Sequence, residues 1–151
     1  MKAVKIKCRD LMVGDWCCSG HGLPMQIIDV GEGAYAACKE NKGYAWEFSD
    51  VEGCNPHPIE ITTDILKKNG WREESYMMSP YAPFVMTRYF VKDEGDTRLE
   101  YKGNTLTIWF NYEKGNDGVY SDIVIPVKYV HQLQQVLRLA GMAELANNFK
   151  I

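Results

Sequence analysis

Turn-forming sequences interrupt the first third of this chain so often that it has room only for short strands. Glycine-containing turns recur at intervals typical of small β-structures, and no segment between them is long enough for a good helix. The turns lie at residues 19–22, 31–33, 41–43 and 52–53. The intervening segments are rich in β-forming residues or short enough to pair: residues 13–18, 25–30, 34–39 and 44–48. We therefore predict a small, strongly bent, SH3-like β-barrel over residues 1–58.

Two prolines mark a change of character after this region, because each removes a backbone donor and restricts the residue before it. Pro56 and Pro58 therefore predict a domain boundary. It divides the chain into a barrel over residues 1–58 and an α+β subdomain over residues 59–151. A chain of 151 residues has room for no more than two such units.

Local signals specify both ends of a short helix just after the boundary. Thr62 can cap its N-terminus, so the helix should begin at Thr63. Asn69-Gly70 offers a left-handed C-terminal cap, after which Trp71 can fold back on the helix in a Schellman motif. We predict that this helix ends within two turns.

The rest of the chain predicts an antiparallel meander and a helix that covers it. Four segments joined by short turns are typical of strands: residues 84–91, 97–102, 105–112 and 119–127. One face of this sheet is apolar and needs a cover. Apolar side chains recur at helical spacing from Val130 to Ala140, and Gly141 ends the pattern. The expected α+β fold is thus a barrel, a helix, a four-stranded meander and a covering C-terminal helix.

Composition places the chain among folded proteins without a strong charge bias. Hydrophobic residues make up 46%, and 17 basic against 20 acidic residues give a net charge of -3. This excludes a long-range positive field that would gather nucleic acid unspecifically. No apolar run resembles a signal peptide or a membrane span, and an odd number of cysteines, five, favours reduced thiols. We expect a cytoplasmic protein without membrane contact.

Four segments together carry a resemblance to known sequences. They are Leu11-x2-Gly14-Asp15-Trp16, WEFSDVE at residues 46–52, PIEITTDILKKNGW at residues 58–71 and VKYVHQLQQVLRLAG at residues 127–141. In these segments the chain resembles a group of uncharacterised small proteins of Bacteroidetes genomes and their prophages or mobile elements. LKKNGW and YVHQLQ are the most specific parts. The resemblance implies a setting in phage or mobile-element biology, and it implies no activity.

The sharpest metal hypothesis is a zinc site, because thiolate and imidazole are the ligands that zinc prefers. The candidate ligands are Cys17, Cys18, His21, Cys54 and His57, of which the last two have ligand-like spacing. Against this hypothesis, adjacent cysteines seldom chelate one ion well, and a barrel with its own core needs no metal. We therefore expect neither a metal nor a cofactor.

The sequence contains no recognisable motif for any other catalytic chemistry. None of the three histidines is set beside a cysteine by a nucleophile motif. The acidic cluster at residues 93–96 is typical of a solvated hairpin loop, and residues 31–33 lack the lysine and helix of a phosphate-binding loop. We therefore expect that the protein is not an enzyme.

Two segments are candidates for contact with a partner. The first is the polar stripe of the C-terminal helix, which could bind a partner or a phosphate backbone and is otherwise a solvated face. Its members are His131, Gln134, Gln135 and Arg138. The second is residues 76–84 (YMMSPYAPF), which would form an adaptable interaction surface if exposed. We expect these residues to be buried, in the core or in a dimer interface.

Two functions of different classes follow. The first is a non-enzymatic protein-interaction module with an unknown protein partner, either a monomer or a homodimer. The second is a nucleic-acid-binding accessory protein that uses a basic and aromatic surface of the barrel. That surface would contain Lys2, Lys5, Lys7, Arg9, Trp16 and Tyr35. A zinc-binding or thiol-dependent protein is a more distant alternative.

Overall fold

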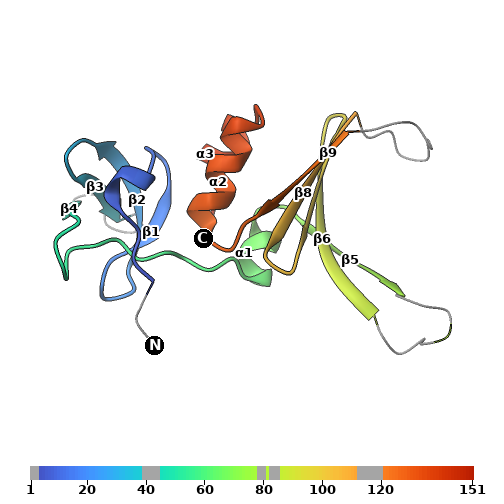
Figure 1. Cartoon of the computed structure of the whole chain (residues 1–151), viewed down its shortest axis with the longest axis horizontal. Coiled ribbons are helices and arrows are strands. Elements are labelled where there is room, and N and C mark those ends of the chain that lie inside the picture. Colours follow the sequence, from blue (N-terminus) through green and yellow to red (C-terminus); the bar gives the residue numbers. More distant parts are fainter. Residues whose placement is uncertain (1–3, 39–44, 78–80, 82–85, 112–120) are drawn as a thin grey trace. The chain divides into compact units, whose positions relative to one another are not determined.

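The computed structural model describes residues 4–38, 45–77, 81, 86–111 and 121–151. The chain forms two compact units, each built on one antiparallel sheet (Figure 1). Unit 1 contains residues 1–61 and 129–151, and unit 2 contains residues 62–128. In chain order, unit 2 is therefore inserted into unit 1. Within the described ranges, no helix is both long enough and apolar enough to cross a membrane.

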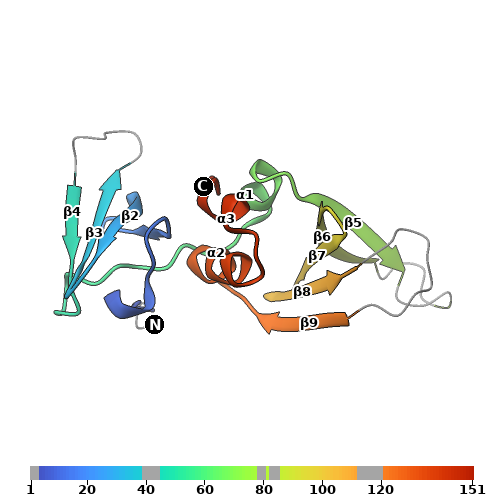
Figure 2. The same cartoon turned by 90° about the horizontal axis from the view of Figure 1, so that it is seen from above.

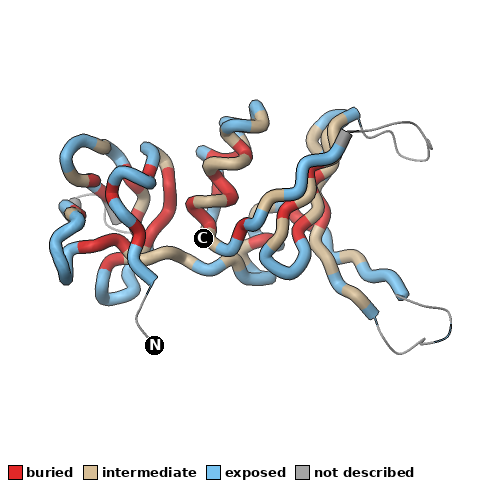
Figure 3. Tube along the Cα trace, viewed as in Figure 1, coloured by how far each residue is buried: buried red, intermediate tan, exposed pale blue. Residues whose placement is uncertain are grey.

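The sheet of unit 1 has four strands that follow one another in chain order. They are β1 (Trp16–Cys18), β2 (Pro24–Val30), β3 (Ala34–Cys38) and β4 (Ala45–Phe48), preceded by the 3-10 turn η1 (Cys8–Asp10). Apolar side chains of the sheet and of the segment before it form one core. The buried members are Ile6, Cys8, Leu11, Cys17, Met25, Ile27, Ala34, Ala36 and Phe48. Figure 3 marks the buried residues along the trace.

The predicted SH3-like barrel is wrong, because this sheet is open. Among the described residues, β4 pairs with β3 and not with β1. The outer edge of β1 is already occupied: Cys18 exchanges two backbone hydrogen bonds with His57, at 2.8 and 2.9 Å. Trp16 donates its N–H to the side chain of Gln134. The groups that a closing strand would need are therefore already bonded.

Two helices complete unit 1, α2 (Val130–Leu139) and α3 (Ala143–Asn147). The predicted end of α2 is confirmed, since Gly141 has a φ of +83° and its N–H donates to the carbonyl of Arg138. The predicted covering of the meander by this helix is wrong. α2 belongs to unit 1, where it contacts β1 and α3. An amphipathic pattern shows that a helix face is covered, but not by what.

The chain leaves unit 1 and re-enters it at adjacent points. The N–H of Val130 donates to the carbonyl of Ile59 at 2.9 Å, and Glu60 forms an antiparallel bridge with Tyr129. The two connections to unit 2 therefore begin side by side within unit 1.

Unit 2 consists of a short helix and a five-stranded antiparallel meander (Figure 2). Its elements are α1 (Thr63–Lys68), β5 (Arg72–Met77), β6 (Met86–Glu94), β7 (Thr97–Lys102), β8 (Thr105–Phe110) and β9 (Ser121–Pro126). The prediction of four strands is wrong, because β5 adds a fifth at one edge. The side chains at the start of β5 are charged and paired with neighbours, as in the contact of Arg72 with Asp93 at 2.8 Å. A strand without apolar alternation gives no periodic signal.

The predicted ends of α1 are confirmed. The hydroxyl of Thr62 accepts a hydrogen bond from the N–H of Ile65 at 3.3 Å. At the other end Gly70 has a φ of +78°, and the N–H of Trp71 donates to the carbonyl of Leu66 at 3.1 Å. This is the Schellman geometry, and it is specified by residues close together in the sequence.

Candidate functional sites

The first candidate site joins the loop before β1 to helix α2 through the side chain of Gln134, which is 0% exposed. Its Oε1 accepts from the N–H of Trp16, and its Nε2 donates to the carbonyl of Gly14, both at 2.9 Å. The second Nε2 proton goes to the carbonyl of Ala146 at 2.9 Å. The side-chain amide thus bonds to the edge of β1 as the peptide group of a further strand would.

A buried ion pair lies beside this amide. The carboxylate of Asp15, 0% exposed, accepts from the guanidinium of Arg138, from Gln135 Nε2 at 2.6 Å and from the N–H of Met12 at 2.9 Å. The guanidinium in turn packs on Gly14, where an added Cβ would lie 2.9 Å from Arg138 Nη2. Gly14 also has a φ of +90°, so both its conformation and its lack of a side chain are needed.

The polar stripe of α2 is therefore not a solvated face. Gln134, Gln135 and Arg138 direct their side chains to unit 1 itself, and Gln134 has no exposed surface with which to meet a partner. Sequence reasoning missed this because polar side chains at helical spacing look the same whether water or the protein satisfies them. One usable signal was present in the sequence. Gly14-Asp15 and YVHQLQ both belong to the segments that carry the resemblance, and these two segments meet here.

His131, the fourth member of the stripe, is 6% exposed and stacks on Tyr129, with ring centroids 5.9 Å apart. Its Nδ1 is buried without a hydrogen-bond partner. Burial lowers the pKa of His131 below its ordinary value, and the carboxylates of Asp15 and Asp10 oppose this shift. The folded chain therefore holds this imidazole in its neutral form at neutral pH.

We expect unit 1 to lose stability in mild acid through His131. The unfolded chain takes up the proton with a pKa near 6.5, whereas the folded chain takes it up only at lower pH. The stabilisation is therefore complete above the unfolded pKa and is lost as the pH falls through the folded pKa. His131→Phe should flatten the dependence of unfolding free energy on pH by up to about 1.4 kcal/mol per pH unit, the slope of one proton.

Urea unfolding of both chains at several pH values between about 4 and 8 measures this slope. Leu139→Phe, which introduces phenylalanine at an exposed position of the same helix, is the control and should leave the slope unchanged. Identical slopes for His131→Phe and the unchanged chain would contradict the assignment.

The proposed zinc ligands are only partly brought together. Cys18 and His57 are adjacent through their backbones, whereas Cys17 is buried in the core and Cys54 and His21 are exposed. Within the part of the chain that the structure describes, no group of three or more His, Cys, Asp or Glu side chains is placed to hold a metal ion. Burial raises the pKa of the Cys17 thiol well above its ordinary value, which is the environment of an inert thiol.

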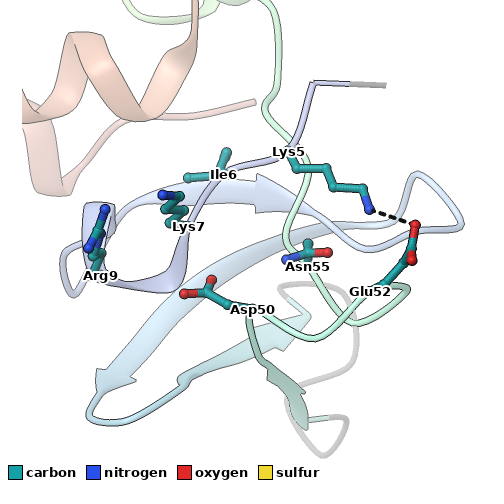
Figure 4. Close-up of a pocket in the computed structure, with 7 residues that line it drawn as sticks. All are labelled: Lys5, Ile6, Lys7, Arg9, Asp50, Glu52 and Asn55. Carbon is teal, nitrogen blue, oxygen red and sulfur yellow. Dashed lines mark ion pairs between the residues drawn. The ribbon is translucent and has the colours of Figure 1, made fainter. Parts of the chain in front are cut away.

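Three of the four basic residues of the proposed nucleic-acid surface line one pocket of unit 1. Lys5, Lys7 and Arg9 line it with Asn55 (Figure 4). Acidic side chains share the pocket, and Lys5 Nζ lies 3.7 Å from a carboxylate oxygen of Glu52. The pocket therefore has mixed charge.

The aromatic part of that surface is not assembled. Trp16 is 1% exposed, and its Nε1 donates to the carbonyl of Phe149 at 2.9 Å, so its ring cannot stack on a base. Tyr35 is exposed, and its hydroxyl lies 3.1 Å from a carboxylate oxygen of Glu47. Lys2 lies outside the described residues.

The second candidate site is a two-stranded arm of unit 2 that extends beyond the rest of its sheet (Figure 1). β6 pairs with β7 over residues 90–94, whereas residues 86–89 pair with β5. We call residues 75–77, 81 and 86–89 the β5–β6 arm. Its exposed large apolar side chains are Tyr76, Met77, Tyr81 and Met86, and Tyr81 is 95% exposed.

The arm is ordered by contacts along one of its faces. Tyr76 packs edge-to-face on Tyr89 with ring centroids 5.6 Å apart. Lys102 Nζ lies 2.8 Å from the hydroxyl of Tyr76 and 5.1 Å from the centroid of its ring. On the opposite face Met77 and Met86 are cross-strand partners.

The expectation that residues 76–84 are buried in the core is wrong for the described members, since Tyr76, Met77 and Tyr81 are exposed. Residues 78–80 and 82–84 lie outside the described part of the chain.

Comparison with known proteins provides no relative from which to argue: no protein-family model, no curated protein and no solved structure matches the chain. Evidence of function therefore comes from the surfaces of the two units.

Proposed function

We propose that the chain is a non-enzymatic protein-interaction module of the cytoplasm, and that the β5–β6 arm is its docking surface. The observation that carries the proposal is the exposure of three large apolar side chains on the two strands, Tyr76, Met77 and Met86, and of Tyr81 in the connection between them. Scattered exposed apolar side chains are ordinary, whereas a group of aromatic and methionine side chains has the composition of an interface core. The resemblance of YVHQLQ and LKKNGW supports a setting in phage or mobile-element biology.

The charges on the arm indicate the chemistry of its partner. Arg88 is exposed beside Met86, and Lys102 lies over Tyr76. Two basic groups thus lie beside the exposed apolar side chains, although the chain as a whole is acidic and Arg88 is paired with Glu73 at 3.6 Å. The partner that fits is a protein with an apolar groove and an acidic rim.

A non-enzymatic role agrees with the use of the buried polar groups in unit 1. The side chains of Asp15, Gln134 and Arg138 are engaged in hydrogen bonds to the loop before β1, to one another or to α3. They act within the fold, where a catalytic side chain would have to reach a substrate.

We expect the triple variant Tyr76→Ser, Met77→Ser, Met86→Ser to lose its partner without losing its fold. Truncating the central anchors of an interface weakens binding by about 2 kcal/mol or more, roughly thirtyfold. The partner is first captured from a lysate of the native host and is then titrated, as a purified protein, against both chains by calorimetry.

A matched control replaces three exposed apolar side chains elsewhere, Ile28→Ser, Val51→Ser and Leu139→Ser. This control should bind the partner as the unchanged chain does. Equal binding by the arm variant would remove the arm from the proposal, and the absence of any captured protein would remove the interaction module.

The nucleic-acid alternative rests on one observation, the convergence of Lys5, Lys7 and Arg9 on the pocket of Figure 4. It predicts a gel shift with DNA or RNA that weakens steeply as salt rises, because phosphate contacts release counterions. The variant Lys5→Ser, Lys7→Ser, Arg9→Ser would abolish that shift. A salt-sensitive shift of this kind, with the arm variant unaffected, would favour the alternative over the interaction module.

A further inference from the structure

We propose that β9 pairs with β9 of a second copy of the chain, antiparallel and centred on Ile123, so that two five-stranded sheets become one. This surface is separate from the β5–β6 arm, since β5 and β9 are the opposite edges of the sheet.

The hairpin between β7 and β8 fixes which backbone groups of β9 point outward. Gly103 and Asn104 form its two-residue turn, with φ of +55° and +63°, so Lys102 and Thr105 are a hydrogen-bonded pair. Hydrogen-bonded pairs alternate along an antiparallel ladder. Residues 105, 107 and 109 therefore bond to β7, and residues 106, 108 and 110 bond to β9.

Residues 106, 108 and 110 of β8 have as their partners on β9 residues 125, 123 and 121. The N–H and carbonyl groups of Asp122 and Val124 consequently point away from the sheet. One hydrogen bond supports this alternation of inward and outward residues along β9. The N–H of Val127, an odd-numbered residue like 121, 123 and 125, donates inward to the carbonyl of Asn104 at 2.9 Å. Pro126 also occupies an outward position, where its missing N–H costs no bond within the sheet.

Among the described residues no strand pairs with the outer edge of β9, and its side chains are unusual for such an edge. Ile123 is 48% exposed and Val124 is 60% exposed, one on each face of the strand. The opposite edge is protected by charge, because Arg72, Glu73 and Glu74 of β5 form ion pairs. An apolar, β-branched edge strand is a template for pairing with another strand.

A second copy is the occupant that the residues of β9 specify. With the two-fold axis at Ile123, Asp122 faces Val124 of the other copy, and all their outward N–H and carbonyl groups are bonded. An axis at Asp122 would place two carboxylates directly opposite, and an axis at Val124 would pair Asp122 with a proline that has no N–H. Pairing at Ile123 also extends an apolar row already present in the sheet, Leu99–Ile108–Ile123.

Sedimentation equilibrium of the full chain, from low to high micromolar concentration, tests the proposal. We expect a monomer–dimer equilibrium that Val124→Asp weakens roughly tenfold or more, because it places like charges opposite each other. Val124→Lys should retain the dimer, because its ammonium would face Asp122 of the other copy. Val51→Asp, a matched change at another exposed valine, should leave it unchanged.

Cysteine crosslinking tests the register and does not depend on the charged variants folding equally well. In a Cys54→Ser background, Ile123→Cys should give a disulfide-linked dimer, because directly opposed residues have Cα atoms about 4.5 Å apart. Val124→Cys should not, because its opposite residue is Asp122. A monomer at all concentrations, equal dimers for Val124→Asp and the unchanged chain, or crosslinking through Val124→Cys would each overturn the proposal.

Discussion

Replacing Gln134 by leucine should unfold unit 1 or leave it only marginally stable. Leucine has nearly the same volume, but it removes the acceptor of the Trp16 N–H and one donor to each of the carbonyls of Gly14 and Ala146. Those two carbonyls keep a second donor, Gln26 Nε2 for Gly14 and the N–H of Phe149 for Ala146. The unsatisfied N–H costs about 1–3 kcal/mol and each lost hydrogen bond to a carbonyl about 0.5–1.5 kcal/mol, roughly 2–6 kcal/mol together. At its upper end that loss reaches the whole stability of a small domain, about 5–15 kcal/mol.

The measurement is urea unfolding followed by tryptophan fluorescence in a Trp71→Phe, Trp109→Phe background, which leaves Trp16 and Trp46 to report on unit 1. Leu139→Gln, an exposed position of α2, is the control and should change the unfolding free energy by no more than about 0.5 kcal/mol. A Gln134→Leu chain as stable as this control would show that the amide does not hold the edge of β1.

The second large effect should come from Asp15. Asp15→Asn removes the charge that compensates Arg138, whose side chain is 11% exposed. Removing one partner of a buried ion pair costs about 3–5 kcal/mol, because the other charge stays buried without compensation. Arg138→Met should cost a similar amount, since the carboxylate of Asp15 is fully buried. The double variant should be less destabilised than the sum of the two by about 2 kcal/mol or more.

The same unfolding measurement on the unchanged chain, the two single variants and the double variant gives this coupling energy. The control is the exposed ion pair of Lys5 and Glu52, where Glu52→Gln should change stability by less than about 1 kcal/mol. Strictly additive effects of Asp15→Asn and Arg138→Met would contradict the ion pair.

Features that depend on neighbouring residues could be predicted from the sequence. Thr62 caps the start of its helix, and Gly70 and Gly141 follow the ends of theirs, as expected. Each cap is made by residues within one turn of the helix end. The hairpin at residues 103–104 was also predictable, since its turn needs two residues that tolerate a positive φ.

Features that depend on distant residues could not be predicted. The edge of β1 is closed by Gln134, 118 positions away from Trp16, and no local pattern reveals that a polar side chain on a helix bonds to a strand edge. The sequence predicted His131, Gln134, Gln135 and Arg138 as a group, and they do lie on one helix. Their role as partner-binding residues stays a prediction, while the structure uses three of them to bind the chain's own backbone and carboxylate.

The side-by-side crossing of residues 59–60 and 129–130 has a consequence for biosynthesis. Unit 2 is continuous in the chain, so all of its strands are synthesised before helices α2 and α3 of unit 1. Unit 1 must wait, because the partners of Asp15 and Trp16 are made after residue 128. Until Gln134 is available, the nascent chain exposes the outer edge of β1 near Trp16, which can then pair wrongly with other chains or bind a chaperone.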